Sequence, residues 1–316
     1  MFTMEKAARP TIYFIGVTTA KSSIMKVFPL WAKEVGLDDA VIKGIDIEIH
    51  AAPEVYREVV RFIKNDPLSM GALVTTHKID LYNAAKELFD YLDPYARMFG
   101  ELSSISKKGG RLEGHAKDPI SSGLAMEGFI PEGFWEEYGG EVFIMGAGGS
   151  AIAISSYLLN KNKGNNIPSR IVISNRSTPR LKEIERIIKT VNPDVPAEFH
   201  HAPVPEVNDR ILDTISEHSL IVNATGLGKD RPGSPLTDAC NFPKNSLVWE
   251  INYRGDLRFM HQAIEQKQEK NLHVEDGWIY FIHGWTQVIA EVFSIDITGD
   301  AFNKFNRIAN EIRLMP

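Results

Sequence analysis

The chain has 316 residues, of which 43% are hydrophobic and 24% are charged. This length predicts two domains, because a single hydrophobic core seldom grows past roughly 250 residues. The formal net charge of −6 comes without a block of like charges, which argues against nucleic acid or an anionic membrane as a partner. We therefore expect a small molecule as the partner.

The first 115 residues alternate short β-rich runs with helical patterns. In chain order we expect strand 11–17, helix 24–35, strand 43–49, helix 54–64, strand 70–75 and helix 79–89. Such alternation is typical of βαβ units and a mostly parallel sheet. A hairpin follows, with strands 102–106 and 111–115 joined by a turn containing Gly109 and Gly110, residues that tolerate the positive φ of a tight turn.

A second alternating series begins at Glu141 and predicts a doubly wound nucleotide-binding sheet. Its β-rich runs are 141–145, 170–174, 197–202, 220–224, 246–251 and 272–274, with helices over 151–160 and 179–190. The tail, 277–315, is predicted to be helical. The expected fold class is therefore α/β with two domains, one of them a Rossmann domain.

Cysteine content and the apolar runs predict a cytoplasmic protein. Cys240 is the single cysteine and cannot form an internal disulfide, and the apolar run behind Arg9 and Pro10 is too short for a secretory signal. No apolar stretch reaches the ~20 residues that a membrane span needs. No metal site is expected, because His200 and His201 are neighbours on a predicted strand and point to opposite faces. We expect a monomer or a homodimer.

The segment 146–151 reads Gly-Ala-Gly-Gly-Ser-Ala, directly after a predicted strand and directly before a predicted helix. This is the G-x-G-x-x-A fingerprint of a dinucleotide site. Gly146 permits the tight turn, Gly148 allows the backbone to approach a pyrophosphate, and Ala151 lets the helix pack close to the strand. The helix N-terminus then faces the anion.

The end of the next strand favours NADP over NAD. An NAD enzyme places an acid there to accept hydrogen bonds from the ribose hydroxyls, but here Asn175, Arg176, Ser177 and Arg180 come before the first carboxylate, Glu183. Two guanidiniums form a planar, charge-assisted site for a 2′-phosphate. The alternative is that both arginines only solvate the start of a helix.

Two ionisable residues follow strands in the first third of the chain. Lys78 comes just after the strand 70–75, and Asp118 just after the hairpin. A lysine beside a carboxylate can move a proton to or from an alcohol or ketone oxygen during hydride transfer. The alternative is that both are solvated surface charges, as most lysines and aspartates are.

Several segments resemble, in order, the motifs of one family over nearly the whole chain. They are GVTTAKSS (16–23), VTTHK (74–78), GELSS (100–104), GHAKD (114–118), GAGGSA (146–151), NRSTPR (175–180), NATGLG (223–228), EINY (250–253) and the tail from Gly277. This set resembles the shikimate dehydrogenase family. The resemblance implies an NADP-dependent oxidoreductase that interconverts an alcohol and a ketone on a small cyclic, polyhydroxylated carboxylate.

The resemblance also implies roles for individual residues. It makes Lys78 and Asp118 the catalytic pair. The implied substrate contacts are Ser22, Ser23, Thr75, Ser103, Tyr253 and Gln287. The implied cofactor contacts are Gly146, Ala147, Gly148, Gly149, Ser150 and Ala151 at the pyrophosphate, Asn175, Arg176, Ser177 and Arg180 at the 2′-phosphate, and Thr225, Ile251 and Gly277, the last two near the nicotinamide. Residues 1–120 with 278–316 would form the catalytic domain, and 121–277 the NADP domain.

The chain departs from the family pattern around the substrate. The second N-terminal serine aligns with Ile24 unless Ser23 replaces it, Thr75 and Val74 compete for one threonine position, and Ser103 stands where the family has asparagine. Lys117 could hold an anionic group of a different substrate or be an exposed loop residue. Losing hydroxyl-binding groups reduces discrimination for that hydroxyl pattern. An NADP-binding regulatory protein without turnover is the alternative function.

Overall fold

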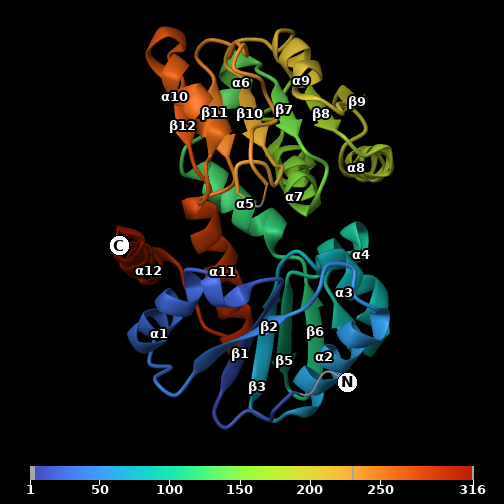
Figure 1. Ribbon diagram of the computed structural model, residues 1–316, viewed down its shortest axis with the longest axis vertical. Coiled ribbons are helices and arrows are strands. Elements are labelled where there is room, and N and C mark those ends of the chain that lie inside the picture. The colour runs from blue at the N-terminus through green and yellow to red at the C-terminus, as the bar shows by residue number, and fades with distance from the viewer. Residues whose placement is uncertain (1–3, 230, 315–316) are drawn as a thin grey trace. The chain divides into compact units, whose positions relative to one another are not determined.

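The computed structural model describes residues 4–229 and 231–314, and they form two compact units (Figure 1). The first unit comprises the chain up to Lys117 and from Gly284 onward, and the second comprises Asp118–His283. Each unit contains a six-stranded sheet. The predicted α/β class with two sheets is therefore confirmed.

The sheet of the first unit is mixed, with the order β2-β1-β3-β5-β6-β4. Its strands are β1 (Thr11–Gly16), β2 (Val41–Asp46), β3 (Ser69–Val74), β4 (Tyr91–Leu92), β5 (Ser104–Lys108) and β6 (Arg111–His115). β1 pairs in parallel with β2 and β3, whereas β5 runs antiparallel to both β3 and β6. The predicted hairpin is the β5–β6 pair.

Helices of the first unit pack through apolar faces. They are α1 (Ile24–Glu34), α2 (Pro53–Asn65), α3 (Lys78–Ala85), α4 (Pro94–Phe99) and α12 (Gly299–Leu314), with short 3-10 turns η1 (Thr19–Lys21) and η2 (Lys86–Leu88). The fully buried Trp31 of α1 stacks on Phe305 of α12 with ring centroids 4.8 Å apart. Its indole Nε1 donates to the Phe305 carbonyl at 2.9 Å. This contact joins the two ends of the chain within one core.

The sheet of the second unit is entirely parallel, with the order β12-β11-β10-β7-β8-β9. Its strands are β7 (Val142–Met145), β8 (Ile171–Asn175), β9 (Ala197–His201), β10 (Leu220–Asn223), β11 (Leu247–Glu250) and β12 (His273–Glu275). Numbered from β7, the order is 3-2-1-4-5-6, the doubly wound arrangement. The order reverses between β7 and β10, where such sheets bind ligands.

The helices of the second unit precede its first strand or lie between its successive strands. They are α5 (Asp118–Glu127), α6 (Phe134–Tyr138), α7 (Gly149–Leu158), α8 (Thr178–Val191), α9 (Pro205–Leu212) and α10 (Arg258–Lys270), with a 3-10 turn η3 (Lys161–Lys163). Helix α11 (Trp278–Phe293) contains the boundary between the units. Buried residues of the central strands, among them Phe143, Ile221 and Val248, form the core under the helices.

Some elements differ from the sequence prediction. The tail consists of two helices rather than one, and Ser294, with a left-handed φ of 53°, follows the end of α11. β2 spans Val41–Asp46 instead of the predicted 43–49. It is an edge strand with several exposed residues, and without a clear apolar alternation its bounds could not be predicted well from the sequence. Helices α4, α5, α6, α9 and α10 were not predicted.

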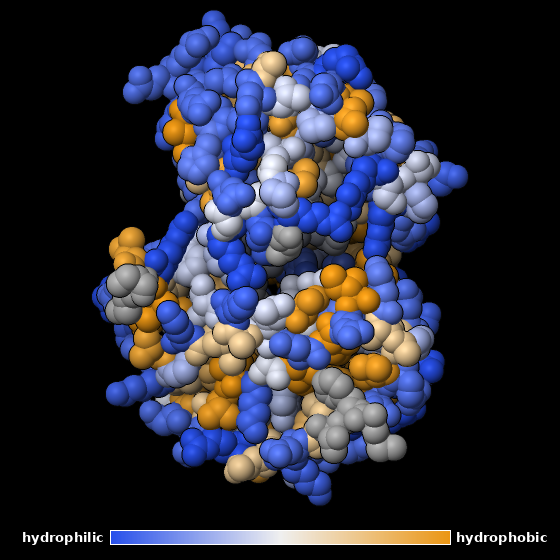
Figure 2. Space-filling view, viewed as in Figure 1, coloured by the Kyte–Doolittle hydropathy of each residue, from blue (hydrophilic) through white to orange (hydrophobic). Residues whose placement is uncertain are grey.

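Among the described residues, no helix is both long and apolar enough to cross a membrane. Large exposed apolar side chains, such as Leu30, Ile49 and Val204, are spread along the chain. On the face shown in Figure 2, apolar residues form separate groups among hydrophilic ones.

Candidate active site

Gly146 directly follows β7 and lies at the edge of the second sheet where the carboxyl ends of its parallel strands meet. Gly146 has φ = 120°, and a Cβ atom there would lie 2.5 Å from the carbonyl oxygen of Ala224. Its N–H donates to the Ser174 carbonyl at 2.7 Å. The backbone therefore requires glycine at the point where the strand order reverses, which gives the first residue of the fingerprint its physical reason.

Helix α7 opens toward the same edge. Gly148 is its N-cap residue and Gly149 its first residue, so the first N–H groups of the helix have no intrahelical partner. A Cβ atom at Gly148 would meet no other atom within 4 Å, which leaves room for a ligand to approach the backbone. Ala151 is fully buried, as expected for a residue that holds the helix close to the strand. Ala147 and Ser150 complete the turn.

The end of β8 places two arginines beside this turn. Asn175 ends the strand and donates from Nδ2 to the Ser177 carbonyl at 3.2 Å, which shapes the entry to α8. The side chains of Arg176 and Arg180 are exposed, and neither forms an ion pair within the described part of the chain. The first carboxylate after the strand, Glu183, pairs with Arg186 at 2.7 Å. The two guanidiniums are thus available to an anion.

The ends of β10 and β11 bring three further predicted cofactor residues together. Thr225 donates from its N–H and hydroxyl to Asn223 Oδ1, at 3.0 and 2.6 Å. The N–H of Ile251 donates to the Asn223 carbonyl at 3.3 Å. A Cβ atom at Gly277 would lie 1.9 Å from the Ile251 carbonyl oxygen, so only glycine permits this approach.

A buried carboxylate at this edge was missed by the sequence reading. Glu250 ends β11, is fully buried, and accepts hydrogen bonds from Asn223 Nδ2 (2.6 Å) and from Asn252 N (2.9 Å) and Nδ2 (2.6 Å). Burial raises the pKa of Glu250 to about 7, although these donors oppose the shift. A charged residue directly after the apolar run Leu-Val-Trp was the signal that could have indicated it.

Tyr253, a predicted substrate contact, lies beside the start of α11. Its ring contacts Trp278 and Phe281, with centroids 5.4 and 4.7 Å apart. The ring is half-buried in this aromatic cluster. Tyr253 follows β11, as Ile251 does, and Gly277 follows the neighbouring strand β12.

The edge of the first sheet gathers three predicted site residues. The N–H of Val74, at the end of β3, donates to the Ser103 carbonyl at 2.9 Å, and the N–H of Leu102 donates to the Lys78 carbonyl at 3.1 Å. Thr75 follows β3 directly, and its N–H donates to β1. Because β5 runs antiparallel to β3, Thr75, Lys78 and Ser103 meet at one edge.

The hydroxyl of Ser103 has a role in the fold that the sequence did not indicate. It accepts the N–H of Lys117 at 2.7 Å and donates a long hydrogen bond to the His115 carbonyl at 3.5 Å. Ser103 is also almost fully buried. The side chain therefore holds the segment that leads to Asp118.

Ser22, Ser23 and Gln287 lie on other elements of the first unit. Ser22 is buried after η1, Ser23 precedes α1, and Gln287 is half-buried on α11. None of their side chains forms a hydrogen bond with Thr75, Lys78 or Ser103 among the residues that the structure describes. Their substrate contacts remain predictions.

Lys117, for which the sequence left two interpretations open, is not an exposed loop residue. Its side chain is 13% exposed and its ammonium pairs with Glu291 of α11. Lys108 pairs with the same carboxylate at 2.5 Å, and His115 Nε2 lies 3.4 Å from it. Glu113, His115 and Glu291 are close enough to share a metal ion, but two ammonium groups already neutralise Glu291.

Asp118 is buried and is the first residue of α5, where a carboxylate interacts favourably with the helix dipole. Its carbonyl accepts the Ser121 hydroxyl at 3.3 Å. Lys78 is likewise the first residue of α3. The two residues fall in different units, and their pairing stays a prediction.

Comparison with known proteins gives relatives of one kind. No family model matches the chain. A shikimate dehydrogenase (NADP(+)) of Paramagnetospirillum magneticum is 26% identical over 241 residues, which are 76% of this chain and 77% of the relative. One of Symbiobacterium thermophilum is 28% identical over 218 residues, 68% of each chain. One of Streptococcus thermophilus is 29% identical over 182 residues, and this match spans 58% of the relative.

Solved structures share the fold. Shikimate 5-dehydrogenase of Listeria monocytogenes, in complex with shikimate and NAD, is 18% identical with a TM-score of 0.72 and covers 97% of this chain and 99% of its own. The Thermus thermophilus enzyme, in complex with NADP(H) and shikimate, is 21% identical with a TM-score of 0.68, over 96% and 99%. A quinate dehydrogenase of Corynebacterium glutamicum, in complex with NAD, is 16% identical with a TM-score of 0.72, over 96% and 99%.

The fold and the sheet edge define an α/β protein with a Rossmann dinucleotide-binding unit. The resemblance to the shikimate dehydrogenase family is confirmed at the level of the family, by curated relatives and by structures of the same two-sheet fold.

Proposed function

We propose that this protein is an NADP-dependent oxidoreductase that acts on a CH–OH group. Its substrate is a small cyclic, polyhydroxylated carboxylate, namely shikimate and 3-dehydroshikimate or a related compound. The observation that carries the proposal is the carboxyl edge of the second sheet, where Gly146 and the start of α7 follow β7, and Arg176 and Arg180, without an ion-pair partner among the described residues, follow the adjacent strand β8. The relatives named shikimate dehydrogenase (NADP(+)) support both the cofactor and the reaction.

The residues present fit a dinucleotide with a 2′-phosphate. The open space at Gly148 and the N-terminus of α7 would hold the pyrophosphate. Arg176 and Arg180 would hold the 2′-phosphate, because neither has an ion-pair partner among the described residues and Glu183 is engaged elsewhere. Ile251 and Gly277 would line the nicotinamide end, and Thr225 would be a further cofactor contact. Residues 121–277 would thus form the NADP domain, and 1–120 with 278–316 the catalytic one.

The proposed mechanism assigns the proton to this chain's own residues. When bound, the nicotinamide supplies the hydride to the ketone or accepts it from the alcohol. Lys78 would donate a proton to the ketone oxygen during reduction, or take the hydroxyl proton during oxidation. Asp118 would keep the lysine side chain in place. Ser22, Ser23, Thr75, Tyr253 and Gln287 would orient the ring.

Two residues near the proposed substrate contacts favour a compound whose hydroxyl pattern differs from that of shikimate. The Ser103 hydroxyl serves the backbone of Lys117, and the Lys117 ammonium serves Glu291. Neither group is therefore free to hold a ring substituent in the described conformation. Because polar matching is worth orders of magnitude in specificity, this change alters which ring is accepted.

A substrate panel tests the proposal. Purified protein with NADP or NAD is offered shikimate, quinate and other cyclic polyols while nicotinamide absorbance is followed. We expect turnover with at least one compound and a preference for NADP. Tight NADPH binding with no turnover on any compound would instead support the regulatory alternative.

Replacing Lys78 separates chemistry from binding. Lys78→Met should lower kcat by about 10²–10⁴-fold, the usual contribution of a general acid or base, while NADPH affinity stays unchanged. Lys43→Met, at an exposed lysine of β2, is the matched control. Equal kcat in Lys78→Met and the control would refute the assigned role.

Replacing the two arginines tests the cofactor preference. The double variant Arg176→Ala, Arg180→Ala should raise the Kd for NADPH by about 10–100-fold, the value of one or two charge-assisted hydrogen bonds. The Kd for NADH should change little, because that ligand lacks the 2′-phosphate. Arg210→Ala, an exposed arginine on α9, serves as the control. Equal weakening of both cofactors would contradict a 2′-phosphate site.

A further inference from the structure

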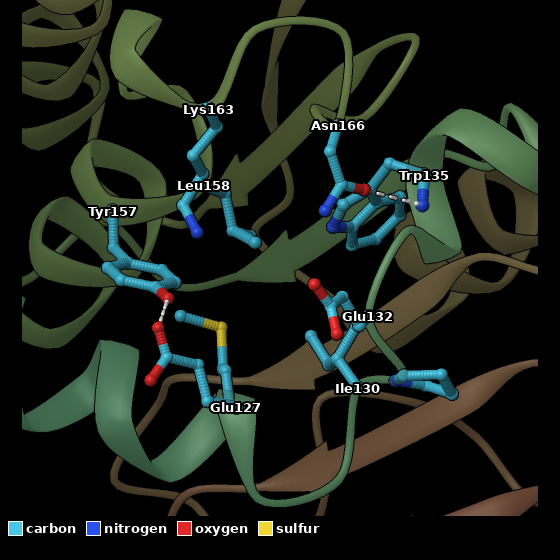
Figure 3. A pocket seen from close by; sticks show the side chains of 10 residues that line it. Glu127, Ile130, Glu132, Trp135, Tyr157, Leu158, Lys163 and Asn166 are labelled. Atoms are coloured by element: carbon cyan, nitrogen blue, oxygen red, sulfur yellow. Dashed lines mark hydrogen bonds between the residues drawn. The ribbon is translucent and has the colours of Figure 1, made fainter.

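A cavity lies within the second unit, at the end of α7 that is far from Gly146. Its volume is about 360 Å³, within the range of roughly 300–1,000 Å³ of small-molecule sites. The last residues of α5 and α7, the segment that enters α6, and residues 163–166 form its walls (Figure 3). Because α7 has 10 residues, about 15 Å of helix separates this pocket from the proposed pyrophosphate site.

One wall carries hydrogen-bond donors. The Lys163 ammonium lies 3.9 Å from the centroid of the Tyr157 ring, is half-buried, and has no carboxylate within ion-pair distance among the described residues. Burial lowers the pKa of Lys163, and only the more distant Glu127 opposes this. Asn166 Oδ1 accepts the backbone N–H of Trp135 at 3.1 Å. That bond fixes the amide and leaves its NH₂ group as a donor.

The facing wall carries carboxylates. Glu127 accepts the Tyr157 hydroxyl, and burial together with this carboxylate raises the pKa of Tyr157. Glu132 forms no hydrogen bond or ion pair with a residue that the structure describes. Glu132 is an exposed residue, and Figure 3 shows its side chain below Asn166 and Trp135, across the cavity from Lys163. One carboxylate is therefore engaged and the other is available.

Apolar side chains lie between the charged groups. Met126, Ile130, Leu158 and Trp135 line the cavity, and Leu158 and Trp135 are buried. A ligand that filled the space would bury apolar surface against them, which favours an apolar group.

We propose that this pocket binds an α-amino acid with an apolar side chain. Its carboxylate pairs with Lys163 and the Asn166 amide, its ammonium pairs with Glu132, and its side chain fills the apolar part of the cavity. A phosphate or other simple anion would face two carboxylates with one cation. A simple amine would face the Lys163 ammonium, and a purely apolar ligand would desolvate both charges without compensation. This binding is independent of the proposed dehydrogenase activity.

Isothermal titration calorimetry tests the two charges of the ligand separately. The probes are L-phenylalanine and L-leucine, with 3-phenylpropionate lacking the ammonium and 2-phenylethylamine lacking the carboxylate. At least one amino acid should bind saturably at a 1:1 ratio, and both single-charge analogues should bind at least about tenfold more weakly. Absence of saturable binding by both amino acids overturns the proposal, as does equal binding by either analogue.

Variants then assign the charges to residues. Lys163→Met should weaken the amino acid at least about tenfold but not 2-phenylethylamine, and Glu132→Gln should weaken it similarly but not 3-phenylpropionate. The matched controls are Lys161→Met, at a lysine that pairs with Asp194, and Glu136→Gln, at an exposed residue of α6. Unchanged thermal unfolding and NADPH binding verify the fold. Unaltered amino-acid affinity in both pocket variants would place the ligand elsewhere and refute the site.

Discussion

The candidate sites at the two sheet edges differ in what determines their residues, which is backbone geometry in one unit and side-chain interactions in the other. In the second unit, backbone geometry decides the residues, because Gly146 and Gly277 each approach a carbonyl too closely for a side chain. In the first unit the deciding groups are side chains, and Ser103 and Lys117 are engaged with the protein itself. A site made of backbone can keep its motif while its neighbours change, whereas a site made of side chains changes with each substitution.

The largest effect is expected from a substitution at Gly146, where backbone geometry determines the residue. Gly146→Ala places a methyl group 2.5 Å from the Ala224 carbonyl at φ = 120°, so it should destabilise the protein by about 3 kcal/mol and reduce NADPH affinity at least 100-fold. Urea denaturation and fluorescence titration measure the two effects. Gly148→Ala is the paired variant, since its Cβ meets nothing. It should keep full stability while weakening NADPH, and a stable Gly146→Ala would refute the steric argument.

A smaller effect is expected from the ion pairs of the first unit. Glu291→Gln removes the carboxylate that pairs with the half-buried Lys117, which should lower the free energy of unfolding by about 2 kcal/mol at pH 7. Burial opposes ionisation of Glu291, but Lys108 and Lys117 hold its pKa down to about 2. Its stabilisation is therefore present above the unfolded pKa of about 4.5 and is lost as pH falls from there toward 2.

The pH dependence separates this ion pair from a packing effect. Urea titrations at several pH values should show the stability of the wild type approaching that of Glu291→Gln as pH falls from about 4.5 toward 2. Glu311→Gln, at an exposed carboxylate of α12, should match the wild type throughout. A stability difference that stays constant between pH 7 and pH 3 would contradict the ionic origin. NADPH affinity should not change in either variant.

The same contrast explains what the sequence could and could not predict. The alternation of strands and helices and the Gly146 turn are local patterns, so the fold class and the glycine turn at the sheet edge, where we propose the cofactor, could be predicted. The pairing of Lys117 with Glu291 joins residues 174 positions apart, which no local spacing reveals. Helix α5 was missed although Asp118 followed by Pro119 is a helix-start signal. Glu250 was missed because its partners, Asn223 and Asn252, meet it only at the sheet edge.

A pH-dependent effect sharpens the comparison at Glu250, an ionisable side chain that is buried at the edge of the second sheet. Because burial raises the pKa of Glu250 to about 7, the folded state holds its proton more tightly than the unfolded state, whose pKa is about 4.5. The stability that this proton gives is complete below pH 4.5 and is lost as pH rises through 7. A shift of this size corresponds to about 3 kcal/mol.

Glu250→Gln should remove this pH dependence, because an amide does not ionise. The free energy of unfolding of the wild type, minus that of the variant, should fall by about 2–3 kcal/mol between pH 4.5 and 8 in urea titrations. The new amide meets the Asn223 NH₂ group, which lowers stability by about 1 kcal/mol at every pH and so leaves the slope intact. Glu265→Gln, at an exposed residue of α10, should show no slope. A flat difference curve for Glu250→Gln would mean that Asn223 and Asn252 solvate the carboxylate well enough to cancel its burial.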